Sequence, residues 1–235
     1  DLVRRSNSPS AVKTSAGSPP VPAAWASSAS SRRLKLTSEL STNTALEQDL
    51  DQLRKNADEL YRTFPYLTGA IDHRTDNVIG RGLDPRARIG DVPGTTAEQR
   101  QGWNAELNEL WKQWSRVCGP RGSSWTQDLR TVMKEWKRSG DSFVVWSDTL
   151  RNGKPIPLQL NPVSARRCLN PTTKTTKASE LRRMGIEFDT TGEVVKYFFS
   201  KLEPGDNWDK LKFDEFPADR VAHIYDEVWP DQIRG

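Results

Sequence analysis

The hydrophobic pattern between about residues 45 and 139 has the three- and four-residue steps of α-helices. The first stripe consists of Leu46, Leu50, Leu53, Ala57, Leu60 and Phe64. Pro65 cannot continue that helix, and the residue before a proline avoids helical backbone angles. We therefore expect the first helix to end near Phe64 and a second helix to begin at Pro65.

The second helix is expected to end between residues 77 and 82, where two glycines occur. Its apolar positions are Leu67, Ala70 and Ile71. Gly80 and Gly82 are predicted to be structural turn residues, because glycine adopts positive φ without a steric cost. His73 lies among charged residues in the middle of this helix. We expect it to be solvated or bonded to a neighbouring subunit, not catalytic.

Two further helices are predicted after a short strand, which the alternation of Leu83, Ala87 and Ile89 indicates. Thr95 and Glu98 have the spacing of a capping box, which predicts a helix that runs to Val117. Its apolar face comprises Trp103, Leu107, Leu110, Trp111 and Trp114, and we expect Trp111 and Trp114 to be core. The fourth helix ends at Gly140 and carries Trp125, Leu129, Val132, Met133 and Trp136.

From Asp141 onward the hydrophobic period falls to two, which is typical of strands. The segments SFVVWSDTL and IPLQLNPV form one predicted hairpin with a turn at Asn152-Gly153, and GIEFDTTGEVVKYFFSKL forms a second around Thr191-Gly192. A further strand is predicted in FPADRVAHIYDEV. The polar, basic segment at 164–183 is predicted to be an exposed loop. Helices at about 45–139 followed by antiparallel hairpins at about 141–229 favour an α+β fold.

The whole net charge of +4 falls in the N-terminal segment, where residues 1–45 carry six basic and two acidic side chains. This segment is rich in Ser, Ala and Pro and has few large apolar groups. We expect residues 1–44 to be a flexible arm, and residues 45–235 to be the folded domain. Its candidate contact residues are Arg4, Arg5, Arg32, Arg33 and Lys35.

The basic arm is consistent with DNA binding, with protein contact or with plain disorder. Its cations suit DNA phosphates, but they equally suit the surface of a neighbouring subunit. Trp25 stands alone in the polar tract and has the character of an anchor for a partner's pocket. The sequence therefore favours protein contact over DNA contact.

The sequence contains no GxSxG, GxxxxGK[ST], GxGxxG or HExxH motif, so we predict no catalytic residue, no metal site and no cofactor. His223 lies in an alternating segment and is predicted to be a strand residue. Cys118 and Cys168 lack the spacing of a zinc site or disulfide framework, and we expect two reduced, half-buried thiols. No apolar run of about 18 residues and no secretory signal occurs, which favours cytosolic synthesis and no membrane contact.

Six segments of this chain, in order, resemble the lambda family of phage portal proteins. They are NADELYRTFPYLTGAIDHRTDNVIGRGL, ELNELWKQWSRVCG, RTVMKEWKRSGDSFVVW, IPLQLNPVSARR, GIEFDTTGEVVKYFF and FPADRVAHIYDEVWPDQIRG. The positions that match the family's motifs include Pro65 and, in the closing Gln-x-Arg-Gly, Gln232, Arg234 and Gly235. The resemblance covers about residues 45–235, which would correspond to the outer wing of a portal subunit.

The resemblance implies a structural subunit, not an enzyme. Portal proteins form a homo-oligomeric ring, usually of twelve copies, at one vertex of the capsid, which makes them part of the virion after assembly in the host cytoplasm. The ring forms the channel for packaging and ejection of double-stranded DNA and is the head-tail junction. Its partners are the major capsid protein, the terminase motor and the head-tail adaptor proteins.

In the family, a stem and a clip follow the Gln-x-Arg-Gly, whereas this sequence stops at Gly235. We therefore expect the stem, the clip, the motor-docking region and the channel lining to lie outside this chain. Two alternatives to a portal subunit remain open. One is a DNA-processing enzyme, such as a metal-dependent nuclease assembled from scattered carboxylates, and the other is a different ring-forming scaffold protein of the virion.

Overall fold

The computed structural model describes residues 41–148, 156–171, 181–202 and 212–235. All described elements belong to one compact unit, Leu40–Gly235. The helices are α1 (Thr42–Thr63), α2 (Pro65–Ile79), α3 (Ala97–Arg116) and α4 (Trp125–Ser139). The strands are β1 (Asp141–Ser147), β2 (Gln159–Val163), β3 (Arg182–Arg183), β4 (Ile186–Phe188), β5 (Val194–Ser200), β6 (Phe213–Pro217) and β7 (Val221–Tyr225).

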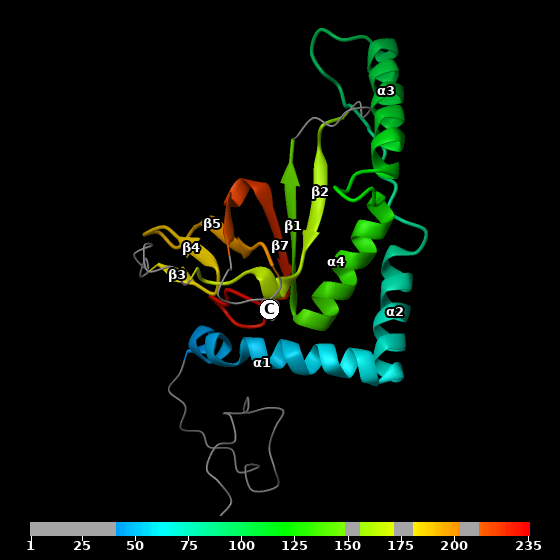
Figure 1. Cartoon of the computed structure of the whole chain (residues 1–235). Helices are drawn as coiled ribbons and strands as arrows, with labels where there is room; N and C mark the ends of the chain where they lie inside the picture. Colours follow the sequence, from blue (N-terminus) through cyan, green and yellow to red (C-terminus); the bar gives the residue numbers. More distant parts are fainter. Residues whose placement is uncertain (1–40, 149–155, 172–180, 203–211) are drawn as a thin grey trace, which may run out of the picture. The chain divides into compact units, whose positions relative to one another are not determined.

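The strands form two antiparallel sheets, one in the order β2-β1-β7 and the other in the order β3-β4-β5-β6. The inner faces of both sheets contribute to one hydrophobic core, whose members include Phe143, Val145, Ile186 and Phe199. Helix α4 lies beside β1 and β2, α2 lies against α4, and α1 crosses below them (Figure 1). The predicted α+β fold is therefore confirmed.

The break between the first two helices is confirmed at Pro65, the first residue of α2. Both predicted hairpins are also present, as β1–β2 and β4–β5, although the Asn152-Gly153 turn lies outside the described residues. β7 occurs within the predicted last strand. The pattern missed β6, which pairs with β5 from Phe213 onward.

The predicted strand at 83–89 is wrong, because this segment is irregular. Its backbone does not pair with another strand; the amides of Ala87 and Ile89 donate to Asn108 Oδ1 and Asn104 Oδ1, both at 2.8 Å. These asparagines belong to α3. Side chains of α3 thus provide the acceptors that a partner strand would otherwise provide. The alternating hydrophobic pattern cannot distinguish these two cases.

The start of α3 is one residue later than predicted. The capping box consists of Thr96 and Gln99, with Gln99 N donating to Thr96 Oγ1 at 3.2 Å and Thr96 N donating to Gln99 Oε1 at 2.9 Å. Thr95 instead donates its hydroxyl to the carbonyl of Val92 at 2.7 Å. The sequence contains two overlapping capping-box patterns, Thr95/Glu98 and Thr96/Gln99. The second one forms, because the hydroxyl of Thr95 is bonded to Val92.

The apolar face of α3 is buried only toward its C-terminal end. Trp114 is buried, Trp111 is half-buried, and both rings contact Trp125 of α4 with centroids 6.0 Å and 5.5 Å away. Trp103 and Leu107 are 42% and 44% exposed. The prediction of a core stripe therefore fails for the N-terminal half of the helix.

The predicted exposed loop at 164–183 is wrong at both ends, and residues 172–180 lie outside the described ranges. Ala165 and Cys168 are fully buried, and Arg182–Arg183 form β3. Neither cysteine forms a disulfide, and both are buried instead of half-buried. None of the described helices is both long and apolar enough to cross a membrane.

Candidate functional site

The most unusual feature of the described structure is a buried cluster of charged side chains around Asp141, the first residue of β1. Gly140, with φ 87°, ends α4 and turns the chain directly into β1. The fully buried carboxylate of Asp141 accepts hydrogen bonds from Arg54 of α1 and Arg234 of the C-terminal segment. His223 of β7 places Nε2 3.2 Å from the same carboxylate. Four separate segments therefore meet at one side chain.

Arg234 extends this cluster by donating to three backbone carbonyls. Its guanidinium nitrogens lie 2.7 Å from the oxygen of Met184, 3.2 Å from that of Cys168 and 3.0 Å from that of Ala165. Arg54 adds bonds to the carbonyls of Ser139 and Ala165, at 3.1 Å and 3.3 Å. Because a buried guanidinium needs acceptors for its donors, these contacts offset much of its desolvation cost.

A contact between two glycines brings the C-terminal segment against the α4–β1 junction. A β-carbon on Gly235 would lie 2.1 Å from the carbonyl oxygen of Gly140, and one on Gly140 would lie 2.5 Å from the carbonyl carbon of Gly235. No side chain fits at either position without movement of the backbone. This close approach gives a physical reason for the Arg-Gly sequence at 234–235.

The negative charge of Asp141 is stabilised by Arg54 and Arg234, whereas the two guanidinium groups repel each other. Burial alone would raise the pKa of Asp141, but Arg234, the bond from His223 and Arg54 lower it well below its usual range. Burial lowers the pKa of His223 more than the bond to Asp141 raises it, so the ring is neutral at neutral pH. Burial and the neighbouring Arg234 lower the pKa of Arg54 to about 10, which still leaves it charged. Asp141 therefore carries the negative charge between two guanidinium groups.

The ring of His223 is packed between aromatic side chains. Its ring stacks on Phe143 at a centroid distance of 4.3 Å and on Tyr225 at 4.4 Å. The carboxylate beside it is occupied by two guanidinium groups, unlike the carboxylate of a catalytic pair, which orients a histidine toward a nucleophile. Burial raises the pKa of the nearby Cys168 thiol to about 11, which keeps it protonated. Among the described residues, no group of three or more His, Cys, Asp or Glu side chains is arranged to hold a metal ion.

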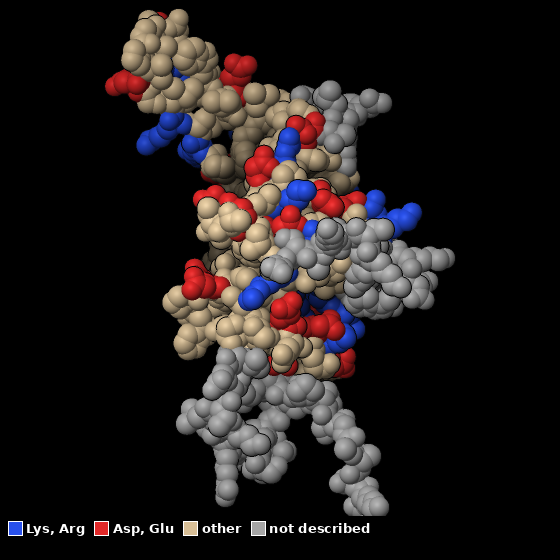
Figure 2. All heavy atoms as spheres, turned by 90° about the vertical axis from the view of Figure 1, so that its left-hand side faces the viewer, with Lys and Arg blue, Asp and Glu red and all other residues tan. Residues whose placement is uncertain are grey.

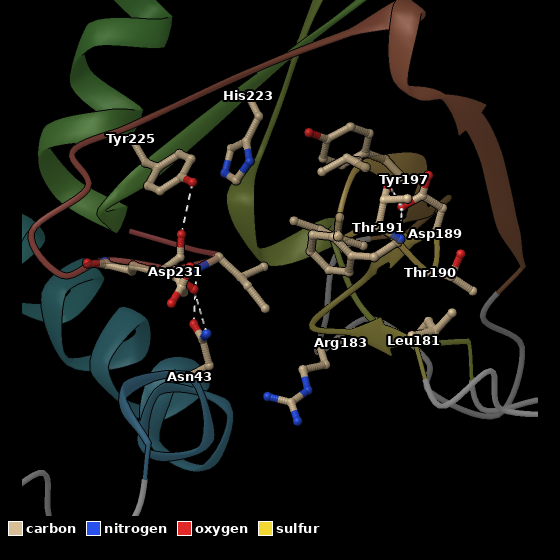
Figure 3. A pocket seen from close by; sticks show the side chains of 16 residues that line it. Asn43, Leu181, Arg183, Asp189, Thr190, Thr191, Tyr197, His223, Tyr225 and Asp231 are labelled. Carbon is tan, nitrogen blue, oxygen red and sulfur yellow. Dashed lines mark hydrogen bonds between the residues drawn. The ribbon is translucent and has the colours of Figure 1, made fainter.

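A cleft of about 860 Å³ lies next to this cluster (Figure 3). Asn43 and Asp231 line one side, Tyr197 and Asp189 of the β4–β5 hairpin line the other, and His223 lies between them. The Asn43 side chain donates to the carbonyl of Asp231 at 2.7 Å and accepts from the amide of Ile233 at 2.9 Å. α1 thus holds the C-terminal segment as one wall of the cleft.

Gln232 shapes the segment that precedes this wall. Its buried side-chain Oε1 accepts from the amides of Val228 and Trp229 at 3.0 Å and 3.2 Å, and its backbone N–H donates to the carbonyl of Trp229 at 3.1 Å. Asp231 adopts φ 64°, a left-handed conformation that is uncommon for residues other than glycine. The segment 228–232 is therefore a fixed turn, not a loose connection.

The charged residues around His73 connect α2 with α4 through ion pairs. Asp72 pairs with Lys134 at 2.7 Å, Asp76 pairs with Arg130, and His73 itself is exposed. Gly80 and Gly82 have φ 54° and 112°, and a β-carbon on Gly82 would lie 2.3 Å from Thr126 Oγ1. This turn therefore fits against the start of α4.

The arm residues Arg4, Arg5, Arg32, Arg33 and Lys35, and also Trp25, lie outside the described residues. Over the face of the described unit drawn in Figure 2, acidic and basic side chains are interspersed. This face is not the continuous basic surface typical of a protein that follows a nucleic-acid backbone.

The sequence analysis did not predict this cluster. One signal for it was present, namely charged residues at inward-facing positions. Arg54 lies four residues after Leu50 on the apolar stripe of α1, and Asp141 alternates with Phe143 and Val145 on the inward face of β1. A charged residue at an inward position needs a partner. Arg234 was noted only as part of a motif, and its partner depends on the tertiary fold.

Comparisons with known proteins give one family. No curated protein matches the sequence significantly. The family described as "Phage portal protein, lambda family" matches residues 30–235, which include the four helices, both sheets and the buried cluster. This match begins within the segment predicted to be the arm and extends through the Gln-x-Arg-Gly. The chain therefore belongs to the lambda family of phage portal proteins.

Proposed function

We propose that this chain is a structural subunit of the portal ring at the unique vertex of a phage capsid. The observation that carries this proposal is the family match over residues 30–235. The family consists of ring-forming, capsid-associated structural proteins. In the proposed role, a ring of about twelve copies forms the channel through which double-stranded DNA enters and leaves the capsid.

The buried cluster supports a structural role, because it fixes the orientation of several elements of the described unit. Asp141, Arg54, Arg234 and His223 tie α1, the α4–β1 junction, β7 and the C-terminal segment to one point. Such a network holds the orientation of these elements, because moving any one of them breaks a hydrogen bond to a buried, charged carboxylate. A subunit that must hold its place in a ring around moving DNA benefits from this rigidity.

The proposed partners follow from the family and not from a contact within this unit. They are further copies of the chain, the major capsid protein, the terminase motor, the head-tail adaptor proteins and the genomic DNA. Within this proposal, residues 45–235 form the wing, residues 1–44 form an arm, and the subunit resides at the portal vertex of the virion.

Negative-stain electron microscopy of the assembled protein tests the proposal. We expect rings of about twelve subunits with a central hole. Closed particles without a hole would favour another virion scaffold protein. Incubation with plasmid and Mg²⁺ addresses the enzymatic alternative: nicking that is lost on replacing Asp72, His73 and Asp76 would contradict the portal assignment.

A further inference from the structure

We infer that the cleft described above binds the uncharged stretch at residues 14–31 from the arm of a second copy of this chain. This inference rests on the proposed ring and names one contact between its copies. Two buried polar side chains that line the cleft, Tyr197 and His223, carry it, because each keeps one polar atom without a hydrogen-bond partner among the described residues.

The hydroxyl of Tyr197 is the first of these atoms. Tyr197 lies in β5 and is only 6% exposed, yet its Oη forms no hydrogen bond within the described ranges. The other tyrosine of the cleft, Tyr225, donates its hydroxyl to the carbonyl of Gln232 at 3.0 Å. Burial raises the pKa of Tyr197 to about 12, so its hydroxyl is neutral. A buried hydroxyl without a partner loses hydrogen-bond free energy, and Tyr197 therefore has a donor available for a ligand.

The Nδ1 atom of His223 is the second. The side chain is 7% exposed, and its Nε2 lies 3.2 Å from the carboxylate of Asp141. Because Asp141 carries a negative charge between two guanidinium groups, its oxygen accepts and Nε2 carries the proton. In the neutral ring, Nδ1 then keeps a lone pair and can only accept. No described residue donates to Nδ1, so it is an acceptor available for a ligand.

These two atoms select an uncharged peptide as the ligand. The rings of Tyr197 and His223 are in edge contact at a centroid distance of 5.9 Å, so the two atoms belong to one wall of the cleft. A carboxylate has no donor for Nδ1, and an ammonium group has no acceptor for the Tyr197 hydroxyl. A peptide has both N–H and C=O groups. The remaining wall suits apolar side chains, since it includes Ile186, Phe188, Val194 and Ile233.

The size and charge of the cleft agree with such a ligand. A volume of about 860 Å³ is within the range of pockets that enclose a ligand of several residues or a drug-sized molecule. Arg183, Asp189 and Asp231 are the charged side chains among the described lining residues, and they carry both signs. The cleft therefore has no strong preference for a charged partner.

Residues 14–31, TSAGSPPVPAAWASSASS, have the matching chemistry. They form the longest stretch of the sequence without a charged side chain. Pro19, Pro20 and Pro22 lack an N–H but keep carbonyl acceptors, and proline-rich segments dock on aromatic-lined grooves in other proteins. Trp25 adds a large apolar ring with one N–H, which can donate to Nδ1 of His223. We expect the carbonyls of the proline-rich part to accept from Tyr197.

The connection is long enough for a contact between copies. Helix α1 begins at Thr42, which is 17 residues after Trp25. An extended chain of that length spans at most about 60 Å. A compact unit of about 200 residues has a radius of gyration of about 16 Å. The stretch can therefore reach the cleft of an adjacent copy in the proposed ring.

Cross-linking in the full chain tests which copy supplies the occupant. Copies with Ala24→Cys are mixed with copies with Thr190→Cys, at an exposed position of the cleft, and treated with a short bis-maleimide; the native cysteines are buried. We expect a covalent dimer from this mixture. Thr63→Cys replaces Thr190→Cys as the matched control, since Thr63 is also exposed but ends α1 away from the cleft lining, and it should give no dimer. With both substitutions on every copy, we expect linked oligomers.

Peptide binding tests the chemistry of the cleft. The probe is a fluorescent peptide with the sequence of residues 14–31, titrated with full chain that carries Trp25→Ala. Trp25→Ala in the peptide should weaken binding by about thirtyfold. Tyr197→Phe in the chain should weaken it by about two- to tenfold and leave the urea midpoint unchanged, because the lost hydroxyl has no partner within the described unit. Tyr225→Phe is the matched control, since it loses the internal bond to Gln232 and should lower the urea midpoint instead.

The outcomes separate this inference from the proposed function. Rings that form normally while the peptide does not bind and no dimer is cross-linked would overturn the inference and leave the portal role intact. An internally linked monomer from the doubly substituted chain would overturn the contact between copies. Peptide binding that tolerates Tyr197→Phe and the peptide's Trp25→Ala would also overturn it. Peptide binding by a chain that forms no rings would contradict the portal role alone.

Discussion

Replacing Arg234 by methionine should destabilise the protein strongly, although it keeps an unbranched apolar stem in place of the aliphatic part of arginine. The change removes the guanidinium from Asp141 and from the carbonyls of Met184, Cys168 and Ala165. Removing one partner of a buried ion pair typically costs about 3–5 kcal/mol, and the carbonyls left without this donor add to the loss. For a domain of this size, the expected loss corresponds to roughly 6–20 °C in Tm.

Chemical denaturation measures this effect, and a double-mutant cycle assigns it to the cluster. Asp141→Asn should also be destabilising, because it leaves two buried guanidinium groups without a counter-charge. If the groups interact as described, the double variant should cost less than the sum of the single variants by at least about 1 kcal/mol. Arg74→Met, at an exposed position of α2, should change stability by no more than about 0.5 kcal/mol. A cost below about 1 kcal/mol for Arg234→Met would refute the argument.

The pH dependence of stability provides a second measurement of the same cluster. The pKa of Asp141 is lowered in the folded state, so its stabilising contribution is complete above its unfolded pKa of about 3.9 and is lost as the pH falls toward the folded value. The pKa of His223 is also lowered, so protonation of the unfolded chain reduces stability as the pH falls below about 6.5. His223→Gln should flatten the stability curve below about pH 6.5.

Three further predictions concern packing, backbone conformation and the arm. Trp114→Ala should cost about 3–5 kcal/mol in urea unfolding, whereas Trp103→Ala should cost less than about 1 kcal/mol; equal costs would contradict the described register of α3. Gly80→Val should impair folding or ring yield because Gly80 has φ 54°, while His73→Ala should preserve both; a more harmful histidine variant would reverse the interpretation of this helix. Deletion of residues 1–44 should reduce ring or procapsid assembly and leave DNA affinity unchanged. Instead, a salt dependence with a slope near about −3.6 that disappears with the arm would show that it binds about four phosphates.

Local signals in the sequence predicted most of the fold. The helix break at Pro65, the end of α4 at Gly140 and the hairpin at Thr191-Gly192 depend on residues next to one another, so the chain itself specifies them. The errors occurred where distant groups decide the outcome. The amides of the segment at 83–89 donate to side chains of α3, and within the described residues the stripe of α3 is exposed at Trp103 and Leu107.

The candidate site was less predictable than the fold for the same reason. Arg234 and Asp141 are separated by more than ninety residues, and no spacing rule relates them. The charge of Arg54 within an apolar stripe predicts that a buried partner exists, but it does not say which one. The family resemblance drew attention to Arg234, and the geometry then supplied the reason for its presence.

The central position of β1 has a consequence for biosynthesis. β1 pairs on one side with β2, which follows closely, and on the other side with β7, from Asp141↔Tyr225 to Val145↔Val221. At ribosomal rates of about 5–20 residues per second, roughly 4–16 s separate synthesis of β1 from synthesis of β7. During this interval the nascent chain has a hydrophobic strand with one open edge, and Asp141 lacks Arg234, the second of its two arginine partners. Slow translation or early release between these strands should therefore favour aggregation, and chaperones that bind exposed strand edges should improve the yield of assembly-competent subunits.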